Sequence, residues 1–225
     1  QNSQDQALLE AVKIGDSERA RVLLDGADNI NLSEADGTTA LHYAVLNNQV
    51  NLAATLIRAG AEVNTRTRYG ITPIYLAARN GSRAMTEILL NAGASANETF
   101  NEGETVLMTA ARTGDVATVK ALLDAGAIVD AREDWHGQTP MMWAAAQKHS
   151  AVIALLEEYG AQVNATSSLE EWERQITMEP RDKWLPPGVM SPLHFAAREG
   201  CLDCINTLLE LGAEIDATTP KGISP

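Results

Sequence analysis

The sequence predicts an all-α solenoid of stacked helix-turn-helix units with projecting β-hairpin loops, and three observations lead to this fold class. A Thr or Ser followed by a short apolar stretch, here called an opener, recurs at Thr39, Thr72, Thr105, Thr139 and Ser191. A Gly lies 21 residues after each opener. The apolar stripes of one unit are too short to be buried alone, so neighbouring units must cover them.

Each unit is expected to contain two helices. The hydroxyl of an opener such as Thr72 can accept a hydrogen bond from the free N–H groups of the first helix, and Pro73 fits its first position. Gly81 ends that helix. The second helix carries a late pair of Leu residues and ends at Gly93, where a left-handed C-cap is expected. An extended turn then leads to the next opener.

The repeats divide the chain into four regions. Residues 1–35 are expected to form a degenerate N-terminal capping repeat, since Glu10 lies where later units have Ala and a terminal unit needs a polar outer face. Regular repeats occupy 36–166, an insertion occupies 167–190, and 191–225 hold another repeat and the start of a further one. That last opener, at Ser224, leads us to expect that the natural protein continues.

The five units resemble the ankyrin repeat. The resemblance is carried by "DGTTALHYAVLNN…LIRAGAEVN", "YGITPIYLAARNG…LLNAGASAN", "EGETVLMTAARTG…LLDAGAIVD", "HGQTPMMWAAAQK…LEEYGAQVN" and "SPLHFAAREG…LLELGAEID". It covers nearly the whole chain outside the insertion. The resemblance implies a protein-binding fold without chemistry of its own, in which partners contact the hairpin tips and the exposed ends of the first helices along a concave groove.

Carried over position by position, the resemblance implies a set of partner-binding residues. At the tips these are Arg68, Tyr69, Trp135 and His136, of which the two aromatic residues are of the kind that anchors interfaces. On the first helices, seven residues after the opener, they are Arg79, Arg112 and Arg198. These Arg residues form either a local cationic stripe in the groove or ordinary surface pairs with neighbouring Glu and Asp.

The insertion breaks the regular spacing. From the Gly to the next opener there are 12 or 13 residues, except after Gly160, where there are 31. Because the extra residues replace a tip, stacking can continue through them. We predict an ordered flap over 167–190 that extends the groove, with Trp172 and Trp184 among the partner-binding residues. The other interpretation is a folded-down structural decoration.

Composition restricts the partners. The net charge is −13 and the pI about 4.7, so the chain repels nucleic acid and anionic membrane surfaces at long range. We expect a protein partner, no nucleic acid, no membrane and a monomer. The stretches "EWERQ…EPRDKWLPPG" and "FAAREGC" are similar to exported ankyrin proteins of environmental bacteria. This favours an extracytoplasmic location, periplasmic or secreted, over a cytoplasmic one.

The residues that often carry chemistry have structural explanations here. His42 and His194 are the fourth residues of their openers, where the ankyrin motif often has a structural His. Cys204 aligns with the core positions Leu52, Met85 and Val152 and is expected to be buried, while Cys201 begins the same helix. A disulfide between them would fit an exported protein. Sequons at Asn31, Asn97 and Asn164 fall where the repeat already favours Asn.

We therefore predict a non-enzymatic chain with no catalytic residues, no metal site and no cofactor. The leading hypothesis is a protein–protein interaction module that acts as a scaffold, adaptor or inhibitor. The alternative is a targeting or regulatory repeat region of a larger enzyme or toxin, whose catalytic domain lies outside this chain.

Overall fold

The fold is a row of helix pairs. The computed structural model describes residues 3–168, 189–220 and 222–225. Within these residues the helices are α1 Ser3–Lys13, α2 Ser17–Leu24, α3 Ala40–Leu46, α4 Val50–Arg58, α5 Pro73–Arg79, α6 Arg83–Asn91, α7 Val106–Thr113, α8 Val116–Asp124, α9 Pro140–Ala146, α10 Ser150–Glu158, α11 Pro192–Glu199 and α12 Leu202–Glu210.

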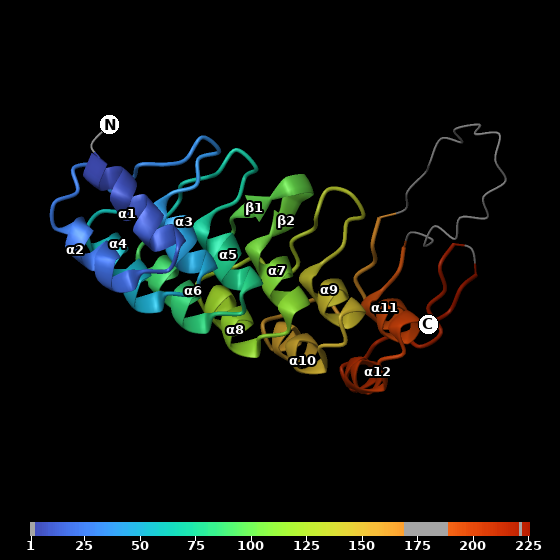
Figure 1. Ribbon diagram of the computed structural model, residues 1–225. Coiled ribbons are helices and arrows are strands. Elements are labelled where there is room, and N and C mark those ends of the chain that lie inside the picture. The colour runs from blue at the N-terminus through green and yellow to red at the C-terminus, as the bar shows by residue number, and fades with distance from the viewer. Residues whose placement is uncertain (1–2, 169–188, 221) are drawn as a thin grey trace, which may run out of the picture.

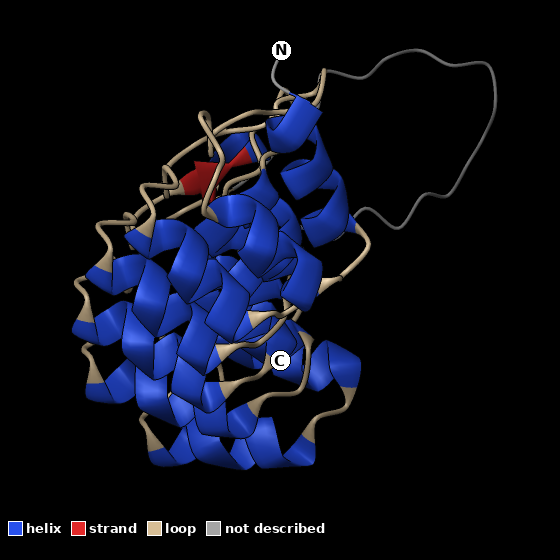
Figure 2. Ribbon diagram, turned by 60° about the vertical axis from the view of Figure 1, so that its left-hand side comes forward, coloured by secondary structure: helices blue, strands red, loops and turns tan. Residues whose placement is uncertain are grey.

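The helices form two layers, as the sequence predicts. Each odd-numbered helix packs on the next odd-numbered one from α1 to α11, and the even-numbered helices follow one another in the same way from α2 to α12. Figure 1 shows the two rows side by side, with the loops between units projecting from one side of the odd-numbered row. Figure 2 shows the same loops gathered along one edge. The first helices therefore form the inner layer and the second helices the outer layer.

The openers start the first helices through their hydroxyl groups. Thr105 Oγ1 accepts a hydrogen bond from the backbone N–H of Met108 at 3.2 Å, and Thr72 Oγ1 accepts one from Tyr75 at 3.4 Å. Where the fourth residue is His42, its Nδ1 lies 2.9 Å from Thr39 Oγ1 and its Nε2 lies 3.1 Å from the carbonyl oxygen of Ile71. A buried His thus joins its own helix to the next tip.

Small side chains let the helices approach closely. The paired Ala residues of the first helices are fully buried, among them Ala77, Ala78, Ala110, Ala111, Ala144 and Ala145. Leu and Met side chains from both layers fill the space between them and form one continuous core from the first unit to the last. Since every helix contributes to this core, no unit is expected to be stable alone.

The tips contain little regular strand. One hairpin, β1 Thr99–Phe100 and β2 Glu104–Thr105, pairs antiparallel with Phe100 opposite Glu104, and a 3₁₀ turn at Asn101–Gly103 connects the two strands. The ring of Phe100 stacks on that of Tyr75 with centroids 4.5 Å apart. This stacking attaches the hairpin to the first helix of the preceding unit.

An Asn side chain links most units to the next, and at one junction Asp130 takes its place and accepts the Gln162 N–H at 3.1 Å. The side-chain amide of Asn97 donates to the carbonyl oxygen of Gly126 at 3.0 Å, and its Oδ1 accepts from the backbone N–H of Ile128 at 2.8 Å. The same type of amide-to-carbonyl bond is made by Asn31, Asn64 and Asn164. The sequence matches at the three sequons are therefore explained by structural Asn residues.

The insertion leaves from an ordinary tip. In a regular tip the N–H of Thr67 donates to Ile71 O at 2.9 Å, and the Ile71 N–H donates to Thr67 Oγ1 at 3.1 Å. Ser167 and Met190 make the same two hydrogen bonds, each at 3.0 Å. The two ends of the insertion thus lie side by side in the fold.

The two Cys residues lie at the start of α12. Cys204 is fully buried, as expected, and Cys201 is 7% exposed. The structure settles the pairing that the sequence leaves open, because Cys201 and Cys204 form a disulfide. Cys201 Sγ also accepts a hydrogen bond from the Cys204 N–H at 3.1 Å, so it serves as the N-cap of the helix.

Candidate protein-binding surface

Neighbouring tips are fastened to one another through their backbones. The Arg68 N–H donates to Asp36 O at 2.6 Å, and the Asp134 N–H donates to Glu102 O at 2.7 Å. The Ser168 N–H donates to His136 O at 2.7 Å, next to the stem of the insertion. These links fix the spacing of the tip side chains, which lowers the entropy that a partner must remove on binding.

Arg68 and Tyr69 form one exposed tip group. The Tyr69 side chain is 57% exposed. The guanidinium of Arg68 lies 5.1 Å from the Tyr69 ring centroid, and its Nη2 donates to the Tyr69 hydroxyl at 2.9 Å. A cation over an aromatic face is attracted by the ring quadrupole. The pair therefore presents a flat apolar surface with a positive edge.

Trp135 and His136 form a second exposed tip group. The Trp135 side chain is 57% exposed, and its ring stacks on that of His136 with centroids 4.6 Å apart. The turn beneath them is held by the buried carboxylate of Glu133, which accepts the backbone N–H groups of Trp135 at 2.7 Å, His136 at 2.9 Å and Gln138 at 2.8 Å. Glu133 is not among the predicted site residues, and its only signal in the sequence is its place two residues before the aromatic Trp135.

The predicted Arg positions of the first helices differ from one another. Arg112 lies over the ring of Trp143 at 5.3 Å, with Nη2 3.6 Å from Glu104 Oε1. Arg198 lies over Phe195 at 5.0 Å and pairs with Glu199 at 2.9 Å. Two of the three therefore form ordinary surface pairs, and Arg66 near the tips likewise pairs with Glu98.

Arg79 is the exception among these three. It is exposed, and it makes no ion pair within the described part of the chain. The three Arg residues of the inner layer thus do not form a continuous stripe of unpaired cationic groups. The cationic charge of this layer is instead partly compensated by carboxylates and lies against aromatic rings.

Aromatic residues four positions after the openers were not among the predicted site residues. Tyr43 and Trp143 project from the inner layer and lie beneath Lys13 at 5.5 Å and Arg112 at 5.3 Å, respectively. Lys13 Nζ and the Tyr43 hydroxyl also donate to Glu34, at 2.6 and 2.8 Å, and these bonds lower the pKa of the Glu34 carboxyl. Their common offset from the openers is the sequence signal that could have identified them.

Two predicted site residues and most of the predicted flap over 167–190 lie outside the residues that the structure describes. Trp172 and Trp184 lie within 169–188, outside the described residues. Among the residues that the structure describes, no group of three or more His, Cys, Asp or Glu side chains has an arrangement that could hold a metal ion. No helix in that same part of the chain is long and apolar enough to cross a bilayer.

The sequence and the fold both match known proteins. Residues 1–67 and 74–167 match the family described as "Ankyrin repeats (3 copies)", and residues 190–220 match "Ankyrin repeat". The fold is similar to the crystal structure of the human ASB11 ankyrin repeat domain, with a TM-score of 0.79 and 27% sequence identity over 96% of this chain and 88% of that one. The chain therefore belongs to the ankyrin repeat family, whose members are generally non-catalytic modules for protein–protein interaction.

Proposed function

We propose that this chain binds a partner protein along the tips and the inner helix layer, and acts through that binding as a scaffold, adaptor or inhibitor. The observation that carries the proposal is the pair of exposed aromatic groups, Tyr69 with Arg68 and Trp135 with His136. Each aromatic side chain is 57% exposed on a tip that is fastened by backbone hydrogen bonds. Large side chains that a fold holds in solvent lose little freedom on binding, which is typical of interface anchors.

The inner layer supports the same proposal. Arg79, Arg112 and Arg198 continue the surface from the tips along the first helices, and the latter two lie flat on aromatic rings. Ion pairs of exposed side chains contribute little to stability, so a partner can exchange its own carboxylates for Glu104 or Glu199 with little loss. The partner is accordingly expected to bring both apolar and acidic side chains.

A site-specific cross-linking experiment tests the proposal. Benzoylphenylalanine replaces Trp135 in one variant and Leu202 in another, and each full chain is irradiated in native extract. Leu202 is 73% exposed but lies at the start of α12, at the end of its unit away from the tips. A protein that cross-links only at position 135 is then purified and its affinity measured.

The affinity of that partner should fall at least tenfold for Trp135→Ala and Tyr69→Ala, and stay within twofold for Leu202→Ala. Truncating one anchor typically weakens binding by about 2 kcal/mol or more. Equal cross-linking at both positions, or affinities that none of the tip variants changes, would show that the tips are not the binding surface.

A further inference from the structure

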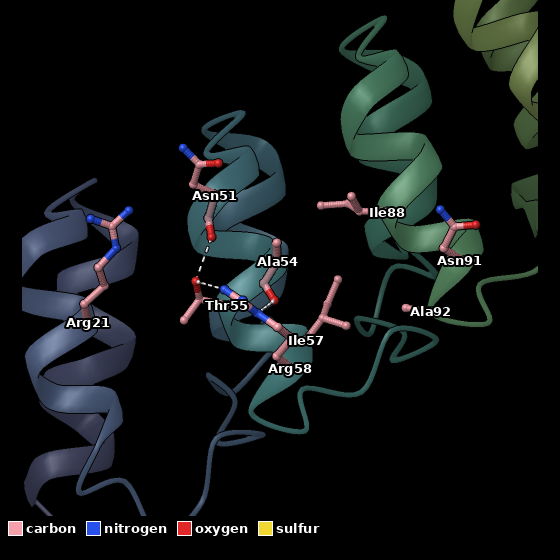
Figure 3. Close-up of a pocket in the computed structure, with 9 residues that line it drawn as sticks. All are labelled: Arg21, Asn51, Ala54, Thr55, Ile57, Arg58, Ile88, Asn91 and Ala92. Atoms are coloured by element: carbon pink, nitrogen blue, oxygen red, sulfur yellow. Dashed lines mark hydrogen bonds between the residues drawn. The ribbon is translucent and has the colours of Figure 1, made fainter.

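The outer layer carries a groove that is separate from the tips. It lies over α2, α4 and α6 and has a volume of about 720 Å³. Ile57 of α4 and Ile88 of α6 contribute apolar side chains, and Figure 3 shows both pointing into the space between these two helices. Arg21, Asn51, Arg58 and Asn91 supply its polar groups.

The charge of this groove is opposite to that of the whole protein. The chain has a net charge of −13, yet the groove is lined by two Arg residues and by no carboxylate. Arg58 donates from Nε to Ala54 O at 3.3 Å and from Nη2 to Thr55 Oγ1 at 3.2 Å. These bonds lay the guanidinium along α4 at the groove, and it makes no ion pair with any described residue.

Arg21 is also available to a ligand. Its ion pair, with Glu18 at 2.9 Å, is to a residue on its own helix, and the two side chains are 44% and 87% exposed. Such exposed pairs are weak and exchange readily with other partners. Both cationic groups of the groove can therefore receive a carboxylate from outside.

The corresponding place between α8 and α10 is closed by the protein's own side chains. Tyr159 donates its hydroxyl hydrogen to Asp124, and Lys120 Nζ donates to Asp124 Oδ2 at 2.8 Å and to the Tyr159 hydroxyl at 2.9 Å. Nineteen residues after the openers, the series reads Arg58, Asn91, Asp124, Glu158 and Glu210. The Arg at this position is thus found only in the unit of Arg58 and is not repeated in the four units that follow.

We propose that this groove is a second docking site, which binds an acidic segment of a partner protein that carries an apolar side chain. The apolar side chain lies between Ile57 and Ile88, and the carboxylates pair with Arg21 and Arg58. The amides of Asn51 and Asn91 offer donors and acceptors to the peptide backbone. A nucleic acid is a poor occupant, because the remainder of this acidic chain repels a polyanion.

The test uses the full chain with ¹³C-labelled Ile methyl groups and three synthetic peptides. The probe is Asp-Glu-Leu-Leu-Glu-Asp; its controls are Lys-Lys-Leu-Leu-Lys-Lys and Asp-Glu-Ser-Ser-Glu-Asp. We expect the probe to shift the Ile57 and Ile88 resonances in a saturable way that weakens with added salt. The two control peptides should bind at least tenfold more weakly, since each lacks one half of the recognition.

Charge-reversal variants identify the site. Arg58→Glu and Arg21→Glu should each weaken binding of the probe at least tenfold. Arg83→Glu changes the net charge equally but alters an exposed residue of α6 outside the groove, paired with Glu87, and should leave the affinity within twofold. Trp135→Ala should have no effect, which separates this site from the tips.

Three results would overturn the proposal. The first is the absence of methyl shifts at millimolar probe, and the second is an equal loss of affinity in the Arg83 and Arg58 variants. The third is an equal response to inorganic phosphate at the same concentration, which would indicate a simple anion site. Methyl spectra of the free variants verify that each is folded.

Discussion

The side-chain amide of Asn164 donates a hydrogen bond to the carbonyl oxygen of Gly212 at 3.1 Å, across 48 residues of chain. Asn97 makes the same contact with Gly126 across 29 residues. The additional 19 residues equal the excess of the spacer that follows Gly160 over a regular spacer of 12. The unit after the insertion therefore stacks in the register that it would have without one.

Asn164→Ala should lower the free energy of unfolding by about 1–2 kcal/mol, because it removes the bonds to Gly212 O and to the Glu214 N–H. Denaturant unfolding measures the change. Thr166→Ala is the matched control, since it also destroys the sequon but removes only the hydroxyl and methyl group of an exposed side chain. If both variants unfold alike, the Asn side chain does not hold the units together.

Replacing residues 168–189 with Arg-Tyr-Gly, the tip sequence at 68–70, should leave a folded protein of equal or greater stability. The bonded pair of Ser167 and Met190 then has the spacing of Thr67 and Ile71. Shortening the loop reduces the free-energy cost of closing it by about 1–2 kcal/mol, because this entropic cost grows with the logarithm of loop length. Thermal unfolding and partner affinity are the two measurements.

A loss of more than about 2 kcal/mol would show that the replaced residues brace the fold, which a simple change of loop length does not predict. An unchanged stability with weaker partner binding would instead support the prediction that 167–190 contribute to recognition. Equal stability and equal affinity would contradict that prediction and leave the tips as the binding surface.

The sequence predicts the two helix layers of this fold because the residues that start, pack and end each helix recur at the same positions from unit to unit. Openers such as Thr72, the buried Ala pairs and the Gly that ends each unit recur in phase, and each has a local physical role. The exposure of Tyr69 and Trp135 also follows from their place in the repeat, since a tip has no neighbour on its outer side.

Other features depend on contacts that the repeat pattern does not contain. Arg112 pairs with Glu104 because the hairpin of Thr99–Thr105 places that carboxylate beside α7, and Glu133 holds its tip only in one turn geometry. The outer groove arises from the side chains of three successive units together, Arg58 and Ile88 among them. Such combinations become visible only once the units are stacked.

Stability should fall below pH 6.5 through His42. Burial lowers the pKa of this His, so its ring stays neutral in the folded protein while it binds a proton in the unfolded chain. Where the unfolded state binds more protons, stability declines as the pH falls, by at most about 1.4 kcal/mol per pH unit for one group. The loss of stability begins near the His42 pKa of the unfolded chain and continues until the pH reaches the lowered pKa of the folded protein.

His42→Met is the matched control, since Met108 and Met142 occupy the same position in other units. Between pH 7.5 and 5.5 the unfolding free energy of the wild type should fall more than that of the variant. Parallel pH profiles in urea titrations would mean that His42 is protonated in the folded protein, contrary to the effect of its burial.

Reducing the disulfide between Cys201 and Cys204 should loosen the start of α12. In some other units the corresponding N-cap residue reaches the preceding unit, as Gln49 does to Gly15 O at 2.9 Å and His149 to Arg112 O at 3.0 Å, whereas Asp115 caps its own helix by accepting the Thr118 N–H at 2.7 Å. Cys201 is bonded within its own helix instead. The disulfide therefore stabilises a helix whose start lacks that link.

The disulfide restricts the unfolded chain, and for so short a loop this loss of chain entropy stabilises the folded state by about 2 kcal/mol. Hydrogen exchange with and without reductant should show faster exchange in α12 and little change in α3 to α8. The variant Cys201→Ala combined with Cys204→Val, Val being the residue at the equivalent position 152, should show the same exchange with and without reductant.

The disulfide also allows a test of the compartment. Since such a disulfide persists in oxidising compartments, its presence in protein isolated under thiol-trapping conditions would support an extracytoplasmic location. Two freely reactive thiols in that material would contradict both the stabilising role of the disulfide and the extracytoplasmic location.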